Sequence, residues 1–259
     1  MSSLIQLEKR DHIAIITINN PPANTWTRDS LGELADTVEA LNGDDNIFAL
    51  VVTGQGEKFF SAGADLKTFA DGDPAKANDM AQAFGRAFEA LSRFRGVSIA
   101  AINGYAMGGG LECALACDLR IAEEQAQMAL PEASVGLLPC AGGTQNLPWL
   151  VGEGWAKRMI LCGERIKADR ALSIGLVEEV VPTGAALDKA LELAAMACKQ
   201  SPSSTARCKT LVMSAREGRS HSDGWRMERE LFVDLFSTED QREGVNAFLE
   251  KRSPEWKNR

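Results

Sequence analysis

The sequence predicts an α/β protein in which stacked sheet-forming units come first and helices come last. Two observations support this prediction. Short apolar runs of strand length recur between residues 4 and 122, and helical spacing of apolar residues dominates from about residue 143 onward. The chain has 259 residues, of which 45% are hydrophobic, so it can form one large domain or one domain with a helical appendage.

The first half of the chain is expected to alternate between strands and helices. Strands are expected at 4–8, 12–18, 48–53, 97–102 and 119–122, and helices at 28–42 and 75–94. The run from Phe48 to Thr53 is almost continuously apolar, as in a strand that is covered on both faces. Thr27 has the side chain to cap the first helix, which ends at Asn42-Gly43.

The second half is expected to be mainly helical, with one last strand at 176–181. Helices are expected at about 144–151, 153–162, 167–173, 187–198, 203–216, 223–236 and 239–250. We therefore divide the chain into an α/β core at 1–200, which holds the functional site, and a helical region at 201–259. Because this region carries many apolar residues in a chain that already has a core, we expect it to form an interface between subunits. These residues are Leu231, Phe232, Leu235, Phe236, Val245, Phe248 and Leu249.

Composition excludes several classes of function. A net charge of −8 argues against nucleic acid or an anionic membrane as the main partner, and no apolar run approaches the roughly 20 residues of a membrane span. The six cysteines form no CxxC pair, and the chain has only two histidines, so we expect reduced thiols and no metal site. The N-terminus lacks the Arg-rich, acid-poor character of a transit peptide, and we expect a cytoplasmic protein.

The stretch from Asn103 to Glu112 carries the strongest chemical signal. The glycines at 108–110 follow an apolar run and open a segment without a helix breaker. Glycines let backbone N–H groups approach a ligand, and a helix N-terminus offers unpaired donors with partial positive charge. This arrangement suits an oxygen atom on which negative charge develops. Glu112 follows on a helix that has no polar face, so we expect its carboxylate to be buried.

Two interpretations of Glu112 stay open at this point. It can be a structural carboxylate that pairs with an arginine, or a catalytic one. The chain has no G-x-S-x-G, H-E-x-x-H or Walker A pattern, and its glycines do not follow the dinucleotide-binding spacing. His12 lies in an expected strand and His221 in a polar connector, so both are expected to be structural or solvated. Any proton transfer must therefore fall to carboxylates.

Three motifs occur in a specific order along the chain. They are Ser61-Ala62-Gly63-Ala64-Asp65-Leu66, then Asn103 to Glu112, then Leu130-Pro131-Glu132 with Gly142-Gly143-Thr144-Gln145. In this order they resemble the crotonase superfamily, and the similarity to enoyl-CoA hydratases extends over essentially the whole chain. The resemblance implies a crotonase-like fold, which is a spiral of stacked ββα units with a helical C-terminal trimerisation region.

The resemblance also implies roles for single residues. Ala64 and Gly109 match the two backbone N–H donors of the oxyanion hole, which binds the thioester carbonyl. Glu112 and Glu132 match the two glutamates that hydratases use to hold and activate water. The residues that match positions near the CoA part of the substrate are Ala23, Ala62, Asp65, Leu66, Lys67 and Gly108, together with Phe248 and Lys251, which are expected to reach a CoA on a neighbouring subunit.

The implied activity is the reversible hydration of a 2-enoyl-CoA thioester in the degradation of fatty acids or related acyl chains. No separate cofactor is expected, because CoA is part of the substrate. Self-association as a trimer or hexamer is implied as well. The retained Glu112 favours hydration over double-bond isomerisation, since isomerases of this superfamily typically keep only the second glutamate. The acyl chain stays open, and a hydratase of branched, aromatic or dicarboxylic chains is a close alternative.

A protein of another class, a non-catalytic scaffold or RNA binder with this fold, is the remote alternative. The acidic balance and the glutamate pair argue against it. Two positions depart from the pattern of the resemblance. Cys140 stands where many hydratases have glycine beside the water, and Trp26 replaces a commoner leucine near the CoA. Both departures concern the fit of the substrate rather than the class of reaction.

Overall fold

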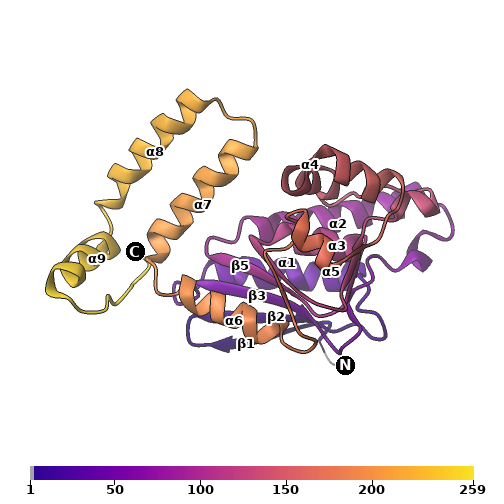
Figure 1. Ribbon diagram of the computed structural model, residues 1–259, viewed down its shortest axis with the longest axis horizontal. Helices are drawn as coiled ribbons and strands as arrows, with labels where there is room; N and C mark the ends of the chain where they lie inside the picture. The colour runs from indigo at the N-terminus through magenta and orange to yellow at the C-terminus, as the bar shows by residue number, and fades with distance from the viewer. Residues whose placement is uncertain (1–2) are drawn as a thin grey trace.

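The computed structural model describes residues 3–259, and it consists of an α/β core from which three C-terminal helices project (Figure 1). The larger sheet has six strands in the order β1-β2-β3-β5-β7-β10. Only β1 and β2 pair in the antiparallel sense, and the other pairs are parallel. These strands are β1 (Ile5–Arg10), β2 (Ile13–Ile18), β3 (Ala49–Gly54), β5 (Val97–Ile102), β7 (Leu119–Glu123) and β10 (Glu179–Val181).

A second sheet of four short strands runs in the order β4-β6-β8-β9. These strands are β4 (Phe59–Ser61), β6 (Tyr105–Met107), β8 (Gln127–Ala129) and β9 (Ile166–Lys167). The chain leaves β3, β5 and β7 of the large sheet and enters β4, β6 and β8 of the small sheet directly afterwards. A helix follows each of these three pairs, so the core is the spiral of stacked ββα units that was expected.

Six helices cover or follow the sheets of the core, and two short 3₁₀ helices join them. The α-helices are α1 (Arg28–Asn42), α2 (Pro74–Ser92), α3 (Gly109–Ala116), α4 (Gly143–Leu161), α5 (Ala168–Ser173) and α6 (Ala186–Ala197); the 3₁₀ helices are η1 (Leu66–Phe69) and η2 (Glu132–Val135). Thr27 caps α1 as expected, in a capping box with Ser30.

The central strand β3 is buried on both faces. Leu50 and Val52 point into the main hydrophobic core, whereas Ala49 and Val51 belong to a second cluster under α6. Because side chains of a strand alternate between its faces, a strand with core on both sides needs a continuous apolar run. This explains the apolar sequence of β3.

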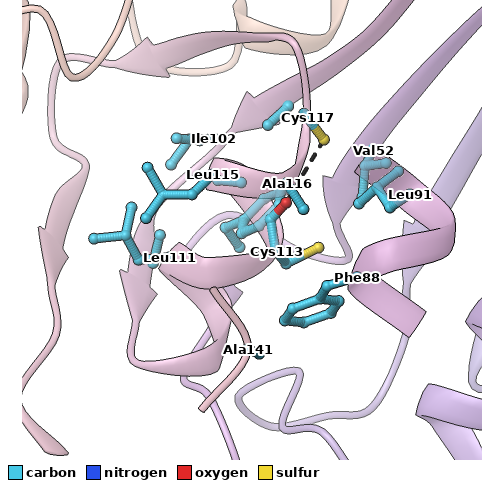
Figure 2. Close-up of a cluster of buried hydrophobic side chains, with 14 of the residues drawn as sticks. Val52, Phe88, Leu91, Ile102, Leu111, Cys113, Leu115, Ala116, Cys117 and Ala141 are labelled. Carbon is cyan, nitrogen blue, oxygen red and sulfur yellow. Dashed lines mark hydrogen bonds between the residues drawn. The ribbon is translucent and has the colours of Figure 1, made fainter. Parts of the chain in front are cut away.

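Helix α3 lies at the centre of the core and is buried along its whole length. Leu111 and Leu115 pack among apolar side chains of the surrounding elements, and Phe88 and Ala141 lie near Cys113 (Figure 2). At its C-terminal end the Cys117 thiol donates to the Cys113 carbonyl oxygen, 3.7 Å away. All six cysteines are free thiols, as expected.

The structure differs from the expected elements in its shortest strands. The strands β4, β6, β8 and β9 were not expected from the sequence, and β10 begins three residues later than the expected start at residue 176. The two helices expected at 144–151 and 153–162 form one span, α4, which is interrupted at Gly152 by a non-helical backbone (φ 77°, ψ 160°).

The remaining helices, α7 (Pro202–Arg216), α8 (His221–Leu235) and α9 (Glu239–Glu250), stand away from the sheets (Figure 1). The expected division at residue 200 falls between α6 and α7. These three helices, residues 202–250, form an arm. Lys209 of α7 connects the arm to the core, because its ammonium donates to the carbonyl oxygens of Phe94 and Gly96 and to the carboxylate of Asp118. No helix within residues 3–259 is both long enough and apolar enough to cross a membrane.

Candidate active site

The start of α3 is built so that a backbone donor is left unpaired. Gly108 precedes the helix with φ 54° and ψ −127°, a conformation that glycine adopts readily, and its own N–H donates to the Ala129 carbonyl of β8. Gly109 is the first helical residue, so its N–H has no partner within the helix. No backbone carbonyl elsewhere in residues 3–259 accepts from it.

A second unpaired donor, the N–H of Ala64, lies on the neighbouring segment. Ala64 forms an isolated parallel bridge with Trp26, in which the bonds run from Trp26 N–H to the Gly63 carbonyl and from Asp65 N–H to the Trp26 carbonyl. The N–H of Ala64 therefore points away from Trp26, and none of the described backbone accepts it. A methyl group placed on Gly63 would lie 3.2 Å from the Gly109 nitrogen, so the two segments are in close contact.

Glu112 is buried, with only 2% of its surface exposed, and it is held by backbone donors rather than by a cation. Its Oε1 accepts from the N–H of Ala141 at 2.8 Å and from that of Gly143 at 2.9 Å. Within residues 3–259 Glu112 makes no ion pair with an arginine, so the structural alternative considered above is not supported. Burial raises the pKa of Glu112, and the two N–H donors oppose part of that shift.

Glu132, at the start of η2, is in the opposite situation. Both of its carboxylate oxygens are shielded from solvent, and neither has a hydrogen-bond partner among residues 3–259. Burial raises the pKa of Glu132 to about 7; its own nearby backbone N–H opposes this rise, and the charge of Glu112 adds to it. An unpaired buried carboxylate is costly, so its retention points to a function.

The two glutamates approach the same helix start from different elements. A methyl group on Gly108 would lie 3.1 Å from Glu132 Oε1, and one on Gly143 would lie 3.0 Å from Glu112 Oε1. Although much of Cys140 is exposed, shielding of its sulfur and the charges of both glutamates raise the pKa of its thiol to about 11. Two unpaired N–H donors thus stand beside two carboxylates, one of which favours its protonated form.

Comparison with known proteins identifies the family. The family model for enoyl-CoA hydratase/isomerase matches residues 8–259. The chain belongs to the enoyl-CoA hydratase/isomerase family. It is 40% identical over 261 residues to the 2,3-dehydroadipyl-CoA hydratase of Escherichia coli, a match that covers 100% of both chains.

Solved structures of similar proteins agree with the fold. DspI of Pseudomonas aeruginosa is 68% identical with a TM-score of 0.95, over 98% of this chain and 97% of that one. An enoyl-CoA hydratase of Bacillus anthracis is 36% identical with a TM-score of 0.94, over 99% of this chain and 100% of that one. The crotonase-like fold expected from the sequence is therefore confirmed.

Most of the residues expected near CoA lie together, next to Gly63 and Ala64. The N–H of Ala62 donates to the Ala23 carbonyl at 3.0 Å, which joins two of them. Asp65 caps η1 by accepting from the N–H of Lys67 at 3.1 Å, and both Leu66 and Lys67 are exposed. The Lys67 ammonium makes no ion pair with the described residues, so its charge is available to a phosphate.

The structure does not bring Phe248 and Lys251 to this site within one chain. Both lie at the end of α9, on the projecting arm, and the Phe248 side chain is 82% exposed. Their contact with CoA is possible only across subunits, as the resemblance implied, and it stays a prediction.

Three residues that hold Glu112 in place were given no role of their own in the sequence analysis. Ala141 and Gly143 hold Glu112 through their N–H groups; Gly142, with φ 98°, gives the turn that presents them. The glycine pair at 142–143 was the available signal. Trp26 was expected near the CoA, but its indole lies against Gly109, where the Phe84 ring also packs.

Other polar groups and cavities do not form a competing site. His12 stacks on Phe48 and bonds to the Asn46 carbonyl, as expected of a structural residue. No cluster of metal-ligating side chains occurs in the described part of the chain. A cavity of about 480 Å³ opens between α3, β7 and α7, but its charged pair, Lys209 and Asp118, is already mutually bonded.

Proposed function

We propose that this chain is an enoyl-CoA hydratase, which adds water reversibly across the 2,3 double bond of a 2-enoyl-CoA thioester. The observation that carries the proposal is the placement of Glu112 and Glu132 beside the unpaired N–H donors of Ala64 and Gly109. The thioester carbonyl accepts from both donors, which makes Cβ of the substrate electrophilic. Each such donor typically contributes about 3 kcal/mol to stabilisation of the developing charge.

The surroundings of the glutamates assign the proton transfers. We assign Glu112 the ionised form, because its two N–H donors oppose the rise in pKa that burial causes, and in this form it takes a proton from the attacking water. The water oxygen bonds to Cβ, and the electron pair of the double bond moves to Cα and onto the carbonyl oxygen. Glu132, protonated near neutral pH, then gives its proton to Cα and restores the thioester. After the forward reaction Glu112 carries a proton and Glu132 is ionised. In the reverse reaction Glu132 is therefore the base that removes the Cα proton, and Glu112 is the acid that protonates the departing hydroxide.

Substitution of each glutamate by glutamine tests this mechanism. The change keeps the shape of the side chain and removes its ability to transfer a proton. We expect Glu112→Gln and Glu132→Gln each to lower the hydration rate of crotonyl-CoA by about 10² to 10⁴-fold, with CoA-ester affinity little changed. The double variant should lose less than the product of the two, because the pair acts on one water. Loss of the enoyl-thioester absorbance measures each rate.

The same experiment separates the alternatives. An isomerase would tolerate Glu112→Gln and fail only with Glu132→Gln, and a non-catalytic scaffold would have no hydration to lose. Wild-type hydration by Glu112→Gln would show that the mechanism is wrong. A panel of 2-enoyl-CoA esters that differ in length, branching and terminal charge would then define the acyl chain.

We also propose the cofactor requirement, location, pathway and assembly of the enzyme. Coenzyme A is the carrier of the substrate, and the mechanism uses no separate cofactor or metal. We place the protein in the cytoplasm, in the degradation of fatty acids or related acyl chains, as a trimer or hexamer. The acidic net charge supports a small-molecule substrate rather than nucleic acid or a membrane as the partner.

A further inference from the structure

Trp26 occupies the junction between the two segments that supply the N–H donors. It is fully buried, at 0% exposure, and it is the largest side chain buried to this degree in the described chain. No step of the proposed mechanism uses it. An indole of this size beside two catalytic donors needs a physical explanation.

The backbone of Trp26 fixes the first donor. Its N–H donates to the Gly63 carbonyl at 2.8 Å, and its carbonyl accepts from the Asp65 N–H at 3.0 Å. These bonds flank Ala64 on both sides, so they set the direction of the Ala64 peptide. Any residue with a normal backbone can make them.

The side chain of Trp26 fixes the second donor. Its indole N–H donates to the Gly109 carbonyl at 3.2 Å, a buried bond that spans 83 residues of sequence. The Cδ1 atom lies 3.4 Å from the position that a methyl group on Gly109 would take. Phe88 supports the indole in an edge contact with ring centroids 5.6 Å apart, and Phe84 packs on Phe88 in the same way at 5.5 Å.

We infer that Trp26 is a positioning residue that sets the spacing between the two donors of the oxyanion hole. One residue bonds to Gly63 and Asp65 through its backbone and to Gly109 through its indole, so it connects both donor segments directly. A leucine at this position would have no side-chain N–H and could not make the second connection. Donors act on a developing oxyanion only when they are held at the right distance, and a displacement of about 1 Å can cost 10²-fold in rate.

The test removes the indole N–H and measures the polarisation of a bound carbonyl. The variant is Trp26→Phe, and a second preparation carries 3-benzothienylalanine at position 26, which keeps the indole shape and replaces N–H by sulfur. The probe is butyryl-CoA with a ¹³C-labelled carbonyl; it is saturated and cannot be hydrated. Difference infrared spectroscopy gives the carbonyl frequency of the bound ester, and crotonyl-CoA gives kcat and KM.

The matched control is Trp256→Phe. The Trp256 indole also donates to a backbone carbonyl, that of Lys199 at 3.0 Å, but it lies at the base of the C-terminal arm. We expect the Trp26 preparations to shift the bound carbonyl frequency toward that of the free ester and to lower kcat by about 10 to 100-fold. KM should change by less than about threefold, and Trp256→Phe should leave all three quantities unchanged.

The inference rests on the proposed oxyanion hole, but the two fail in different ways. A wild-type carbonyl frequency and kcat in the benzothienyl preparation would overturn the role of Trp26 and leave the hydratase proposal intact. A wild-type protein that polarises butyryl-CoA but hydrates no enoyl-CoA would overturn the hydratase proposal alone. The frequency change between wild type and the Trp26 preparations would then still decide the role of Trp26. A bound ester with the frequency of the free ester in wild type would overturn both.

Discussion

At the scale of single residues, Glu112 and Glu132 differ in their hydrogen-bond partners. Glu112 Oε1 accepts two backbone hydrogen bonds, whereas Glu132 accepts none from the described residues. Hydrogen bonds to a carboxylate favour its ionised form, and burial without them favours the protonated form. In the mechanism that we propose, this difference in backbone contacts assigns the base to Glu112 and the acid to Glu132.

This difference predicts the pH dependence of hydration. The active form carries a proton on Glu132, whose pKa is raised to about 7 by burial. As the pH rises through that value the proton is lost, so kcat/KM should fall by about tenfold per pH unit above 7. Initial rates with crotonyl-CoA between pH 6 and pH 9 measure this profile. A kcat/KM that stays constant up to pH 9 would contradict the assignment of Glu132 as the acid.

Stability should depend on pH through the same carboxyl group. Its pKa in the folded state is above the value of about 4.3 expected when unfolded, so the folded state binds more protons between about pH 4.3 and pH 7, and stability falls across that window and stays low above it. Glu132→Gln should therefore raise the free energy of unfolding at pH 8, by on the order of 2 kcal/mol, and raise it much less at pH 5. Urea denaturation at the two pH values measures both. The exposed Glu57→Gln is the control and should show no such difference, and an equal effect of Glu132→Gln at both pH values would count against the assignment.

The sequence predicted the burial of Glu112 but not the contacts that surround the two glutamates. Burial of Glu112 followed from a helix without a polar face, which is a local pattern. The isolation of Glu132 was not predictable, because it depends on where the loop after β8 meets Gly108. The bond from Trp26 to Gly109 connects residues 83 positions apart, and no local pattern records such a contact.

At the scale of elements, α3 and β4 approach so closely that a glycine separates them. A methyl group on Gly110 would lie 2.1 Å from the Ser61 carbonyl oxygen, which belongs to the backbone and cannot rotate away. Gly110→Ala must therefore push the start of α3 away from β4. The N–H of Gly109 moves with it.

We expect Gly110→Ala to lower the free energy of unfolding by about 1–3 kcal/mol or more and to reduce hydration by at least tenfold. The urea midpoint and the rate with crotonyl-CoA measure the two effects. Gly154→Ala in α4 is the control, because a methyl group there meets nothing within 4 Å. It should be neutral or slightly stabilising, since alanine favours the helix. A Gly110→Ala protein with normal stability would show that the contact is relaxed in solution.

The elements that the sequence predicted are those with long, regular patterns. Strands of five or six residues in the large sheet and helices of ten or more residues were located to within a few residues. The missed strands, β4, β6, β8 and β9, have two or three residues each, too few to show an alternating pattern. These strands form because the spiral of the tertiary structure places their segments side by side, so the local sequence does not reveal them.

At the scale of the whole molecule, the arm of α7, α8 and α9 exposes apolar side chains that a single chain leaves uncovered. Phe232, Phe236, Phe248 and Leu249 are all more than half exposed. Patches of this kind usually mark interfaces. The side chains are those for which an intersubunit contact was expected from the sequence.

We predict that the wild-type protein is a trimer or hexamer at micromolar concentration and that Phe232→Asp weakens the assembly. A buried carboxylate without a partner is costly, so the substitution should shift the mass toward the monomer. Light scattering coupled to size exclusion measures the mass of both proteins. Glu228→Gln, on the same helix, should leave it unchanged. A stable wild-type monomer would contradict this prediction and the intersubunit roles of Phe248 and Lys251.

The distribution of tryptophans over the molecule gives the protein a built-in optical reporter. Trp26 is fully buried in the core beside the backbone N–H groups of Ala64 and Gly109. Trp149 and Trp225, in contrast, are more than half exposed. Iodide in solution should quench the emission of the exposed pair and leave that of Trp26, which should be shifted to the blue. The remaining emission then comes from Trp26 at the centre of the candidate site, together with the half-buried Trp155 and Trp256. An acyl-CoA that enters the site should change this quencher-resistant signal before any bond in the thioester is altered.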